Sequence, residues 1–286
     1  MAEPSSFPIA AVIGDPIAHS LSPRMHRYWL KAARLAGEYG PLHIKPADFA
    51  DAIAMLPRLG FVGANVTLPH KEAAAAIADE TEDAVDAMGA ANMLTFLPDG
   101  RIEARNTDWI GFIEAVKAEA PLQAAARGRA LVLGAGGAAA GIVYALQRER
   151  WASIVLANRT HEKAQAFASR FQNDRLDIIP WAEKEKDLGD FDLIVNTTKL
   201  GMLGAPSLNL DLVSARKAAV MDIVYTPLRT PLLREAERCG LITIDGLSML
   251  MRQDAPAFQS WFGAAATVDD GLRAHLIKAL ERDRPA

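Results

Sequence analysis

A segment near residue 65 carries side chains that could bind a small polar molecule and move a proton on it. Residues 63–71 read Gly-Ala-Asn-Val-Thr-Leu-Pro-His-Lys. Because residues two apart on a strand share a face, Asn65 and Thr67 are predicted to point into one site. Lys71 then lies at a helix start, where the helix dipole disfavours its ammonium form and a nearby carboxylate would favour it again. A lysine balanced in this way can exchange a proton at neutral pH, although the common alternative is an ordinary surface lysine.

Two other polar segments could contribute to such a site. Residues 19–23 read His-Ser-Leu-Ser-Pro, and the hydroxyls of Ser20 and Ser22 could both bind one carboxylate. Ser22 could equally be the N-cap of a helix whose first residue is Pro23. Residues 106–108, Asn-Thr-Asp, open a later helix, and a capping role is the common alternative there too. Local sequence leaves both choices open.

A glycine-rich turn in the middle of the chain indicates a dinucleotide site. Residues 131–141 read Leu-Val-Leu-Gly-Ala-Gly-Gly-Ala-Ala-Ala-Gly. Gly134 permits a tight turn, Gly136 lets the backbone approach a pyrophosphate, and Ala139 is an accepted variant of the third glycine of this pattern. Because the turn follows a strand and precedes a helix, we expect a diphosphate on the amides of the helix N-terminus. A merely structural turn is the alternative.

The end of the following strand bears on which dinucleotide is bound. In NAD sites an Asp or Glu at this position holds the ribose 2′-hydroxyl. This chain has Arg159 there, with Lys163 one turn further on. A guanidinium binds a phosphate dianion through paired, charge-assisted hydrogen bonds, so NADP is favoured over NAD. The alternative for Arg159 is a solvated charge at a strand end.

Short apolar runs alternate with helix-length segments, which is typical of α/β layers around parallel sheets. Strands are expected over 9–14, 63–68, 130–133, 154–157, 176–179, 192–196, 219–224 and 241–244. Helices are expected over 23–36, 47–59, 71–80, 107–120, 138–148, 161–171, 231–239, 248–262 and 268–282. Two α/β units followed by helices predict an enzyme with its ligands at strand carboxyl ends, in a cleft between two domains.

Composition excludes several other classes of protein. With 286 residues, two domains are expected, and a net charge of −4 is too mild for nucleic acid or a membrane surface as the main partner. The one cysteine fits a reducing compartment, and the first residues do not read as a signal peptide, so we expect a cytoplasmic protein. The apolar runs are too short for a membrane span, and the six histidines lack metal-ligand spacing, so no metal is expected.

Taken together, these segments resemble the shikimate dehydrogenase family in order and spacing over about residues 9 to 265. The matching segments are 15–23, 63–71, 89–92, 106–108, 134–138, 158–160, 196–202, 222–227 and 246–253, followed by Trp-Phe-Gly at 261–263. One such segment could be an accident, but nine in order could not.

The resemblance implies a role for each matching residue. Lys71 and Asp108 would form the catalytic pair. The substrate carboxylate and ring hydroxyls would be bound by Ser20, Ser22, Asn65, Thr67, Asn92, Tyr225 and Gln253, together with Asp108. NADP would be bound by Gly134, Ala135, Gly136, Gly137, Ala138, Asn158, Arg159, Thr160 and Lys163, with Ile223 and Gly246 beside the nicotinamide and Asp83 as a further contact.

Four positions depart from the family pattern. Asp15 replaces the commoner asparagine, and Lys163 replaces an arginine that often completes the phosphate site. Lys199 and Asp245 together resemble the quinate/shikimate dehydrogenase branch, which accepts both substrates and sometimes both cofactors. Against that branch, Arg159 is not the acidic residue of a strict NAD user, and serine at position 22 fits the shikimate enzymes better than threonine.

The resemblance therefore implies a two-domain α/β enzyme that reduces 3-dehydroshikimate to shikimate with NADP, as a monomer or homodimer. We expect the substrate-binding and catalytic domain over residues 1–107, completed by C-terminal helices over 243–286, and an NADP-binding Rossmann domain over 108–242. The first alternative is a quinate/shikimate dehydrogenase that also uses NAD. The second is a non-catalytic NADP-sensing module, which would have no reason to keep both Lys71 and Asp108.

Overall fold

A computed structural model describes residues 7–120, 128–171 and 175–282. The chain forms two compact units, of which unit 1 comprises Met1–Thr107 and Gln253–Ala286 and unit 2 comprises Asp108–Arg252. The first boundary coincides with the expected one, but the second lies ten residues beyond the expected 242/243. The physical reason is that strand β12, Thr243–Asp245, pairs with β11 and so completes the sheet of unit 2.

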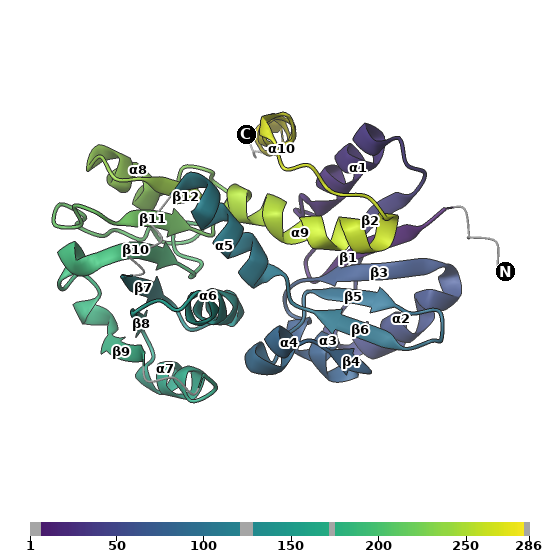
Figure 1. Cartoon of the computed structure of the whole chain (residues 1–286), viewed down its shortest axis with the longest axis horizontal. Helices are drawn as coiled ribbons and strands as arrows, with labels where there is room; N and C mark the ends of the chain where they lie inside the picture. The colour runs from purple at the N-terminus through teal and green to yellow at the C-terminus, as the bar shows by residue number, and fades with distance from the viewer. Residues whose placement is uncertain (1–6, 121–127, 172–174, 283–286) are drawn as a thin grey trace. The chain divides into compact units, whose positions relative to one another are not determined.

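The sheet of unit 1 is mixed and has the strand order β2-β1-β3-β5-β6-β4 (Figure 1). Its strands are β1 (Ile9–Gly14), β2 (Glu38–His43), β3 (Phe61–Val66), β4 (Glu80–Thr81), β5 (Met93–Phe96) and β6 (Ile102–Arg105). β1 pairs in parallel with both β2 and β3, whereas β5 is antiparallel to β3 and to β6. β1 and β3 therefore end at the same edge of the sheet.

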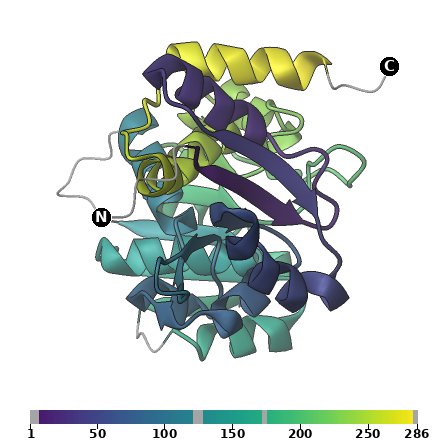
Figure 2. The same cartoon turned by 90° about the vertical axis from the view of Figure 1, so that its right-hand side faces the viewer.

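Helices cover the sheet of unit 1 and bury its apolar side chains. They are α1 (Ser22–Ala33), α2 (Phe49–Met55), α3 (Lys71–Ile77), α4 (Asp83–Met88), the C-terminal part of α9 (Gly246–Phe262) and α10 (Asp270–Arg282). Phe49 and Ile53 of α2 pack with Ile13 and Val66 of the sheet in one buried cluster. α10 lies along α1, where the Trp29 indole donates a hydrogen bond to the carbonyl of Thr267 at 2.7 Å (Figure 2).

Four strands of this sheet were not predicted from the sequence. β2 contains Gly40 and Pro41, which are depleted in strands, and proline is tolerated there because β2 is at the sheet edge. β4 has two residues, and β5 and β6 have four each, too short for an alternating pattern to stand out. The expected helix over 47–59 is instead α2 with a 3₁₀ turn on each side, Pro46–Asp48 and Pro57–Leu59.

The sheet of unit 2 is entirely parallel, with the order β12-β11-β10-β7-β8-β9 (Figure 1). Its strands are β7 (Arg129–Leu133), β8 (Ser153–Asn158), β9 (Leu176–Pro180), β10 (Phe191–Asn196), β11 (Ala219–Asp222) and β12 (Thr243–Asp245). This is the order of a doubly wound dinucleotide-binding sheet, in which the direction of winding reverses between β7 and β10. Ligands bind such sheets beyond the carboxyl ends of the strands at that reversal.

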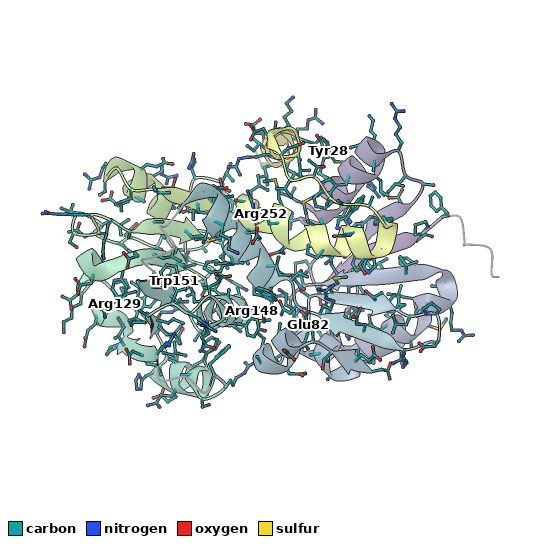
Figure 3. The ribbon with its side chains drawn as sticks, in the orientation of Figure 1. Tyr28, Glu82, Arg129, Arg148, Trp151 and Arg252 are labelled. Carbon is teal, nitrogen blue, oxygen red and sulfur yellow. The ribbon has the colours of Figure 1, made fainter. Side chains whose placement is uncertain are left out.

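The helices of unit 2 are α5 (Asp108–Glu119), α6 (Gly137–Arg148), α7 (His161–Ala168), α8 (Pro231–Arg238) and the first part of α9. α5 packs closely on α6, since a Cβ at Gly141 would lie 3.1 Å from the Cβ of Asp108. The Arg148 guanidinium, labelled in Figure 3, lies 5.0 Å from the centre of the Trp109 ring across the same helix pair. Asp108, the first residue of α5, is therefore packed against α6.

Gly63→Ala should destabilise the protein, because Trp261 packs directly on the backbone of Gly63, where there is no room for a side chain. A Cβ at this position would overlap the Trp261 indole and lie 2.6 Å from the Leu94 carbonyl oxygen. Overpacking of this kind costs about 1–3 kcal/mol in free energy of unfolding. Gly40→Ala is the matched control, because a Cβ there would meet only Arg27, at 4.0 Å. Thermal unfolding of both variants checks this, and equal midpoints would contradict the packing account.

Candidate active site

Five expected substrate residues of unit 1 lie at the edge where β1 and β3 end, namely Ser20, Ser22, Asn65, Thr67 and Asn92. Two backbone hydrogen bonds join the loops beyond these strands, from the Thr67 amide to the Ile13 carbonyl at 2.9 Å and from the Asp15 amide to the Leu68 carbonyl at 3.1 Å. Thr67 packs on Gly14, where a Cβ would lie 2.6 Å from the threonine methyl. The serines after β1 and the lysine after β3 are thus carried by loops that are tied together.

Ser22 is not the N-cap of α1, contrary to one of the two roles that its local sequence allowed. The helix begins at Ser22 itself, and the residue in the N-cap position, Leu21, offers no side-chain bond. The Ser22 amide donates to the Ser20 hydroxyl at 3.3 Å, and the Ser22 side chain hydrogen-bonds to the phenol of Tyr39. Ser22 is only 5% exposed, so its hydroxyl belongs to a buried polar cluster behind the edge of the sheet.

Asn65 and Asn92 form a second buried part of this edge, at 5% and 3% exposure. Asn65 Oδ1 accepts a hydrogen bond from the Tyr39 hydroxyl at 2.7 Å, and its Nδ2 donates to the Asn92 carbonyl at 3.3 Å. Asn92 Oδ1 accepts from the amide and hydroxyl of Thr107 at 2.8 and 3.1 Å. Since both side-chain carbonyls are committed to protein donors, the orientation of each amide is fixed.

Lys71 is the first residue of α3 and is half-buried. Its backbone carbonyl accepts a hydrogen bond from the Ala91 amide at 2.8 Å, which places the lysine next to the segment that carries Asn92. Ser20, Thr67 and Gln253 are also half-buried members of unit 1, whereas Asp83 is exposed in α4. Asp108, buried at the start of α5, and Tyr225, half-buried beyond β11, belong to unit 2.

The glycine turn of unit 2 lies where the winding of the sheet reverses. Gly134 has a φ of +106°, and a Cβ there would lie 2.7 Å from the hydroxyl of Thr197, which follows β10. The Thr197 hydroxyl and amide both donate to the Leu133 carbonyl, at 2.7 and 2.9 Å, so the two strand ends are bonded together. The Gly134 position therefore requires glycine on both conformational and steric grounds.

Gly136 and Gly137 open α6 and leave room for a ligand. A Cβ at either position would meet no atom within 4 Å, so the neighbouring protein does not account for these glycines. Their backbone amides lie at the N-terminus of a helix of 12 residues, where the dipole favours an anion. Ala135 is buried and Ala138 is half-buried in the same turn. The residues present thus fit a dinucleotide diphosphate.

The end of β8 presents two cations. Arg159 and Lys163 are exposed, and neither forms a salt bridge with any residue that the structure describes. The Asn158 amide donates to the Thr160 carbonyl at 2.8 Å and shapes the turn that carries Arg159. An exposed guanidinium and an ammonium one turn apart, without a carboxylate partner, form a site suited to a phosphate dianion.

The ends of β11 and β12 lie in close contact. A Cβ at Gly246 would overlap the carbonyl of Ile223, so only glycine allows this approach of the two expected nicotinamide neighbours. Beside them Asp222 is fully buried and accepts hydrogen bonds from Asn196 at 2.9 Å, Val224 at 3.1 Å and Thr230 at 2.7 Å. Burial raises the pKa of the Asp222 carboxyl to about 6, although all three hydrogen bonds oppose the shift.

Asp222 and Tyr39 were not predicted from the sequence to have a role. Asp222 stands in a segment that matches the family, and a carboxylate at the end of an apolar run was the available signal. Tyr39 offered no such signal, because the strand that carries it was not predicted. Only the structure brings its hydroxyl to Ser22 and Asn65.

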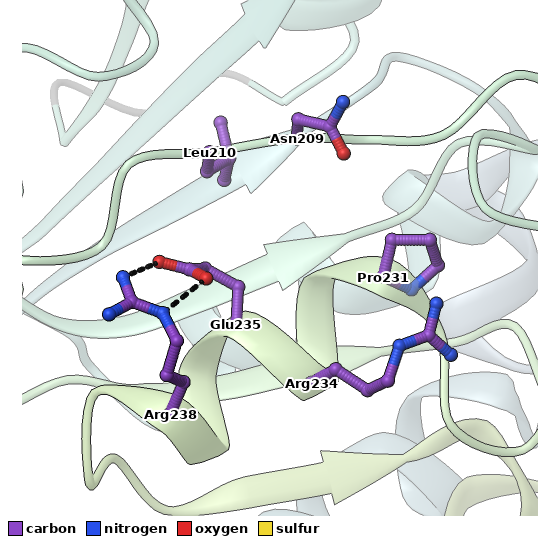
Figure 4. A pocket seen from close by; sticks show the side chains of 6 residues that line it. All are labelled: Asn209, Leu210, Pro231, Arg234, Glu235 and Arg238. Atoms are coloured by element: carbon purple, nitrogen blue, oxygen red, sulfur yellow. Dashed lines mark hydrogen bonds and ion pairs between the residues drawn. The ribbon is translucent and has the colours of Figure 1, made fainter.

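A hollow of about 410 Å³ lies elsewhere in unit 2, between residues 209–210 and α8 (Figure 4). None of the expected site residues lines it. Its Arg238 is bound by both carboxylate oxygens of Glu235, at 2.6 and 2.9 Å, so this guanidinium is already neutralised. Among the described residues, no group of acidic, histidine or cysteine side chains could hold a metal ion, and no helix is long and apolar enough to cross a membrane.

Comparison with known proteins agrees with this geometry. Residues 12–94 match the model of the shikimate dehydrogenase substrate binding domain, and residues 116–248 match that of shikimate / quinate 5-dehydrogenase. The chain is 45% identical over 280 residues to "Shikimate dehydrogenase (NADP(+))" of Cereibacter sphaeroides, which covers 98% of this chain and 100% of the relative.

Two solved structures are similar over almost the whole chain. Shikimate 5-dehydrogenase from Thermus thermophilus, in complex with NADP(H) and shikimate, has a TM-score of 0.83 and 35% identity, covering 96% of this chain and 99% of that one. Quinate dehydrogenase from Corynebacterium glutamicum, in complex with NAD, has a TM-score of 0.85 but 27% identity, covering 95% and 99%. On sequence identity, coverage and fold alike, this chain belongs to the shikimate dehydrogenase family.

Proposed function

We propose that this chain catalyses the reversible, NADP-dependent reduction of 3-dehydroshikimate to shikimate, a step in the biosynthesis of chorismate and the aromatic amino acids. One observation carries the proposal more than any other. The buried Asn65–Asn92 pair, Ser22 and Lys71 stand together at one sheet edge, in a chain 45% identical to a relative named for this activity. A non-catalytic NADP sensor would need neither the lysine nor the fixed amides.

The substrate is bound, in this proposal, by the polar edge of unit 1. The hydroxyls of Ser20 and Ser22 hold the carboxylate of the substrate, with Tyr225 as a further partner. The side chains of Asn65, Thr67, Asn92, Asp108 and Gln253 bind the ring hydroxyls. Asn65 acts as a donor there, because its carbonyl oxygen already accepts from Tyr39.

Lys71 and Asp108 carry the proton chemistry. NADPH, when bound, would supply the hydride for the C3 carbonyl. As negative charge develops on the carbonyl oxygen, the Lys71 ammonium stabilises it, and the Lys71–Asp108 pair gives a proton to that oxygen. The Asp108 carboxylate accepts a hydrogen bond from the same oxygen once that oxygen carries its proton, so that lysine and aspartate exchange the proton as one coupled pair. In the reverse direction the pair removes the proton from the C3 hydroxyl.

NADP is held by unit 2. The amides at residues 134–138 bind the diphosphate, and Asn158, Arg159, Thr160 and Lys163 bind the adenosine 2′-phosphate. Ile223 and Gly246 flank the nicotinamide, and Asp83 of unit 1 is a further cofactor contact. The exposed pair of cations beyond β8 supports NADP rather than NAD, because NAD has no 2′-phosphate for them to neutralise.

A second candidate is a quinate/shikimate dehydrogenase that uses both substrates and both cofactors. It is favoured by Lys199 and Asp245, and the fold itself also serves a quinate dehydrogenase bound to NAD. The further proposals are a cytoplasmic location, which accords with the single cysteine, and a monomer or homodimer.

Initial rates of oxidation of shikimate and of quinate, each with NADP⁺ and with NAD⁺, separate these candidates. The proposed function predicts the highest kcat/KM for shikimate with NADP⁺. Comparable rates on quinate, or comparable rates with NAD⁺, would favour the second candidate. No oxidation of either compound with either cofactor would overturn both.

Lys71→Ala should lower kcat by roughly 10²–10⁴-fold and leave NADP binding unchanged, because a positioned acid or base contributes that much to a proton transfer. Steady-state kinetics and cofactor titration check this. Lys31→Ala, at an exposed position of α1, is the control and should behave as wild type. A Lys71→Ala variant with near-normal kcat and only a raised KM would make Lys71 a binding residue.

Arg159→Leu should weaken NADP by roughly 30–150-fold and change NAD binding by no more than a few-fold. The lost charge-assisted contacts to the 2′-phosphate are worth on the order of 2–3 kcal/mol. Lys163→Ala should cause a smaller loss, since an ammonium is a flexible point charge rather than a planar fork. Arg170→Leu, another exposed arginine of unit 2, is the control. An equal loss for both cofactors would show that Arg159 does not bind the phosphate.

A further inference from the structure

Behind the polar edge of unit 1 lies a buried phenol that the proposed mechanism does not use. Tyr39, on β2, has no exposed surface. Its hydroxyl donates to Asn65 Oδ1 at 2.7 Å, and the Ser22 side chain hydrogen-bonds to the same phenol. One oxygen atom thus links a proposed ligand of the substrate carboxylate to a proposed ligand of the ring hydroxyls.

The hydrogen bond from Tyr39 decides which way the Asn65 amide faces. If that amide were turned by 180°, its carbonyl oxygen would face the carbonyl oxygen of Asn92, which also accepts from the Val66 amide at 2.8 Å. Two acceptors would then oppose each other in a buried place, and the Tyr39 proton would lose its acceptor. With Tyr39 present, Asn65 Oδ1 accepts from the phenol. The group of this amide that remains for a ligand is an N–H donor.

The Tyr39 ring is itself held among other aromatic rings. His26 stacks on it with ring centres 3.8 Å apart and planes 11° apart, and Trp261 stacks at 6.3 Å and 28°. Asp254 lies 3.6 Å from the His26 Nε2, and both side chains are buried. Burial lowers the pKa of His26, the carboxylate of Asp254 opposing the shift, while burial and Asp254 together raise the pKa of Tyr39. The phenol therefore keeps its proton and remains a donor at neutral pH.

We propose that Tyr39 is a positioning residue, whose hydroxyl sets the orientation of Asn65 and Ser22. In this orientation Ser22 can bind the carboxylate of the substrate while Asn65 binds a hydroxyl of its ring. Tyr39 does not touch the substrate in this account, and it acts through the two side chains that do. The kinetic consequences of this inference rest on the proposed function, whereas the orientation of the Asn65 amide can be tested without any substrate.

Tyr39→Phe removes the hydroxyl and keeps the stacked ring. We expect KM for shikimate to rise about 5–50-fold, because two buried polar side chains lose a shared partner, with kcat changed less than KM and NADP affinity unchanged. Tyr28→Phe is the matched control, since Tyr28 lies on α1 against His275, with ring centres 5.2 Å apart (labelled in Figure 3). A merely structural role would lower the unfolding midpoint of Tyr39→Phe and leave KM unchanged, which would overturn the proposal.

A double-mutant cycle tests whether Tyr39 acts through Asn65. If it does, adding Tyr39→Phe to Asn65→Ala should change KM by less than about 2-fold, far less than in the wild-type background. Independent, multiplying effects on KM would overturn the proposal. The same cycle with Ser22→Ala measures the share transmitted to the carboxylate end.

A measurement without substrate separates this inference from the proposed function. The side-chain amide resonances of Asn65, observed by NMR in the ligand-free protein, should shift or broaden in Tyr39→Phe and stay in place in Tyr28→Phe. Unchanged Asn65 resonances in Tyr39→Phe would overturn the positioning role, whatever the enzyme oxidises. Wild-type protein inactive on shikimate would overturn the proposed function and leave this result standing.

Discussion

The hydrogen bond from Tyr39 to Asn65 joins the apolar interior of unit 1 to its polar edge, and the proposed substrate site depends on it. An amide at 5% exposure must have its carbonyl oxygen satisfied by the protein, because an unpaired buried acceptor costs about 1–3 kcal/mol. Tyr39 supplies that partner from the edge strand β2, which is separated from the strand of Asn65 by β1, and the aromatic stack around it keeps the ring in place. The orientation of Asn65 is therefore a property of the core as much as of the site.

In unit 2 too, hydrogen bonds between neighbouring strand ends fix the groups at the edge of the sheet. Parallel strands end together at one edge, so the turn after β7 and the loop after β10 meet, and Thr197 bonds both its hydroxyl and its amide to the Leu133 carbonyl. Gly134 must be glycine to fit beside that threonine, whereas Gly136 and Gly137 border open space. The contrast separates a glycine that the fold requires from glycines that the surrounding protein does not require.

Much of unit 2 was predictable from the sequence, because strand, glycine turn and helix follow one another locally. The strand at 9–14 and the helix at 231–239 were also close to β1 and α8. The strand β2 was not predictable, since Gly40 and Pro41 hide it, and the role of Tyr39 was lost with it. The boundary near 243 was placed too early, because strand pairing rather than composition assigns residues 243–245 to unit 2. The choice for Ser22 between a carboxylate ligand and a helix cap could not be made from the sequence, because the cap depends on the residue at which α1 begins.

A crystal structure of the protein with NADP⁺ and shikimate bound tests the central claim most directly, namely that the polar edge of unit 1 is the shikimate site. The account predicts the shikimate carboxylate within about 3.5 Å of the Ser20 and Ser22 hydroxyls, and Asn65 Nδ2 donating to a ring oxygen. Asn65 Oδ1 should still accept from Tyr39. A carboxylate bound away from both serines, or an Asn65 amide turned so that its oxygen faces the ring, would contradict the account.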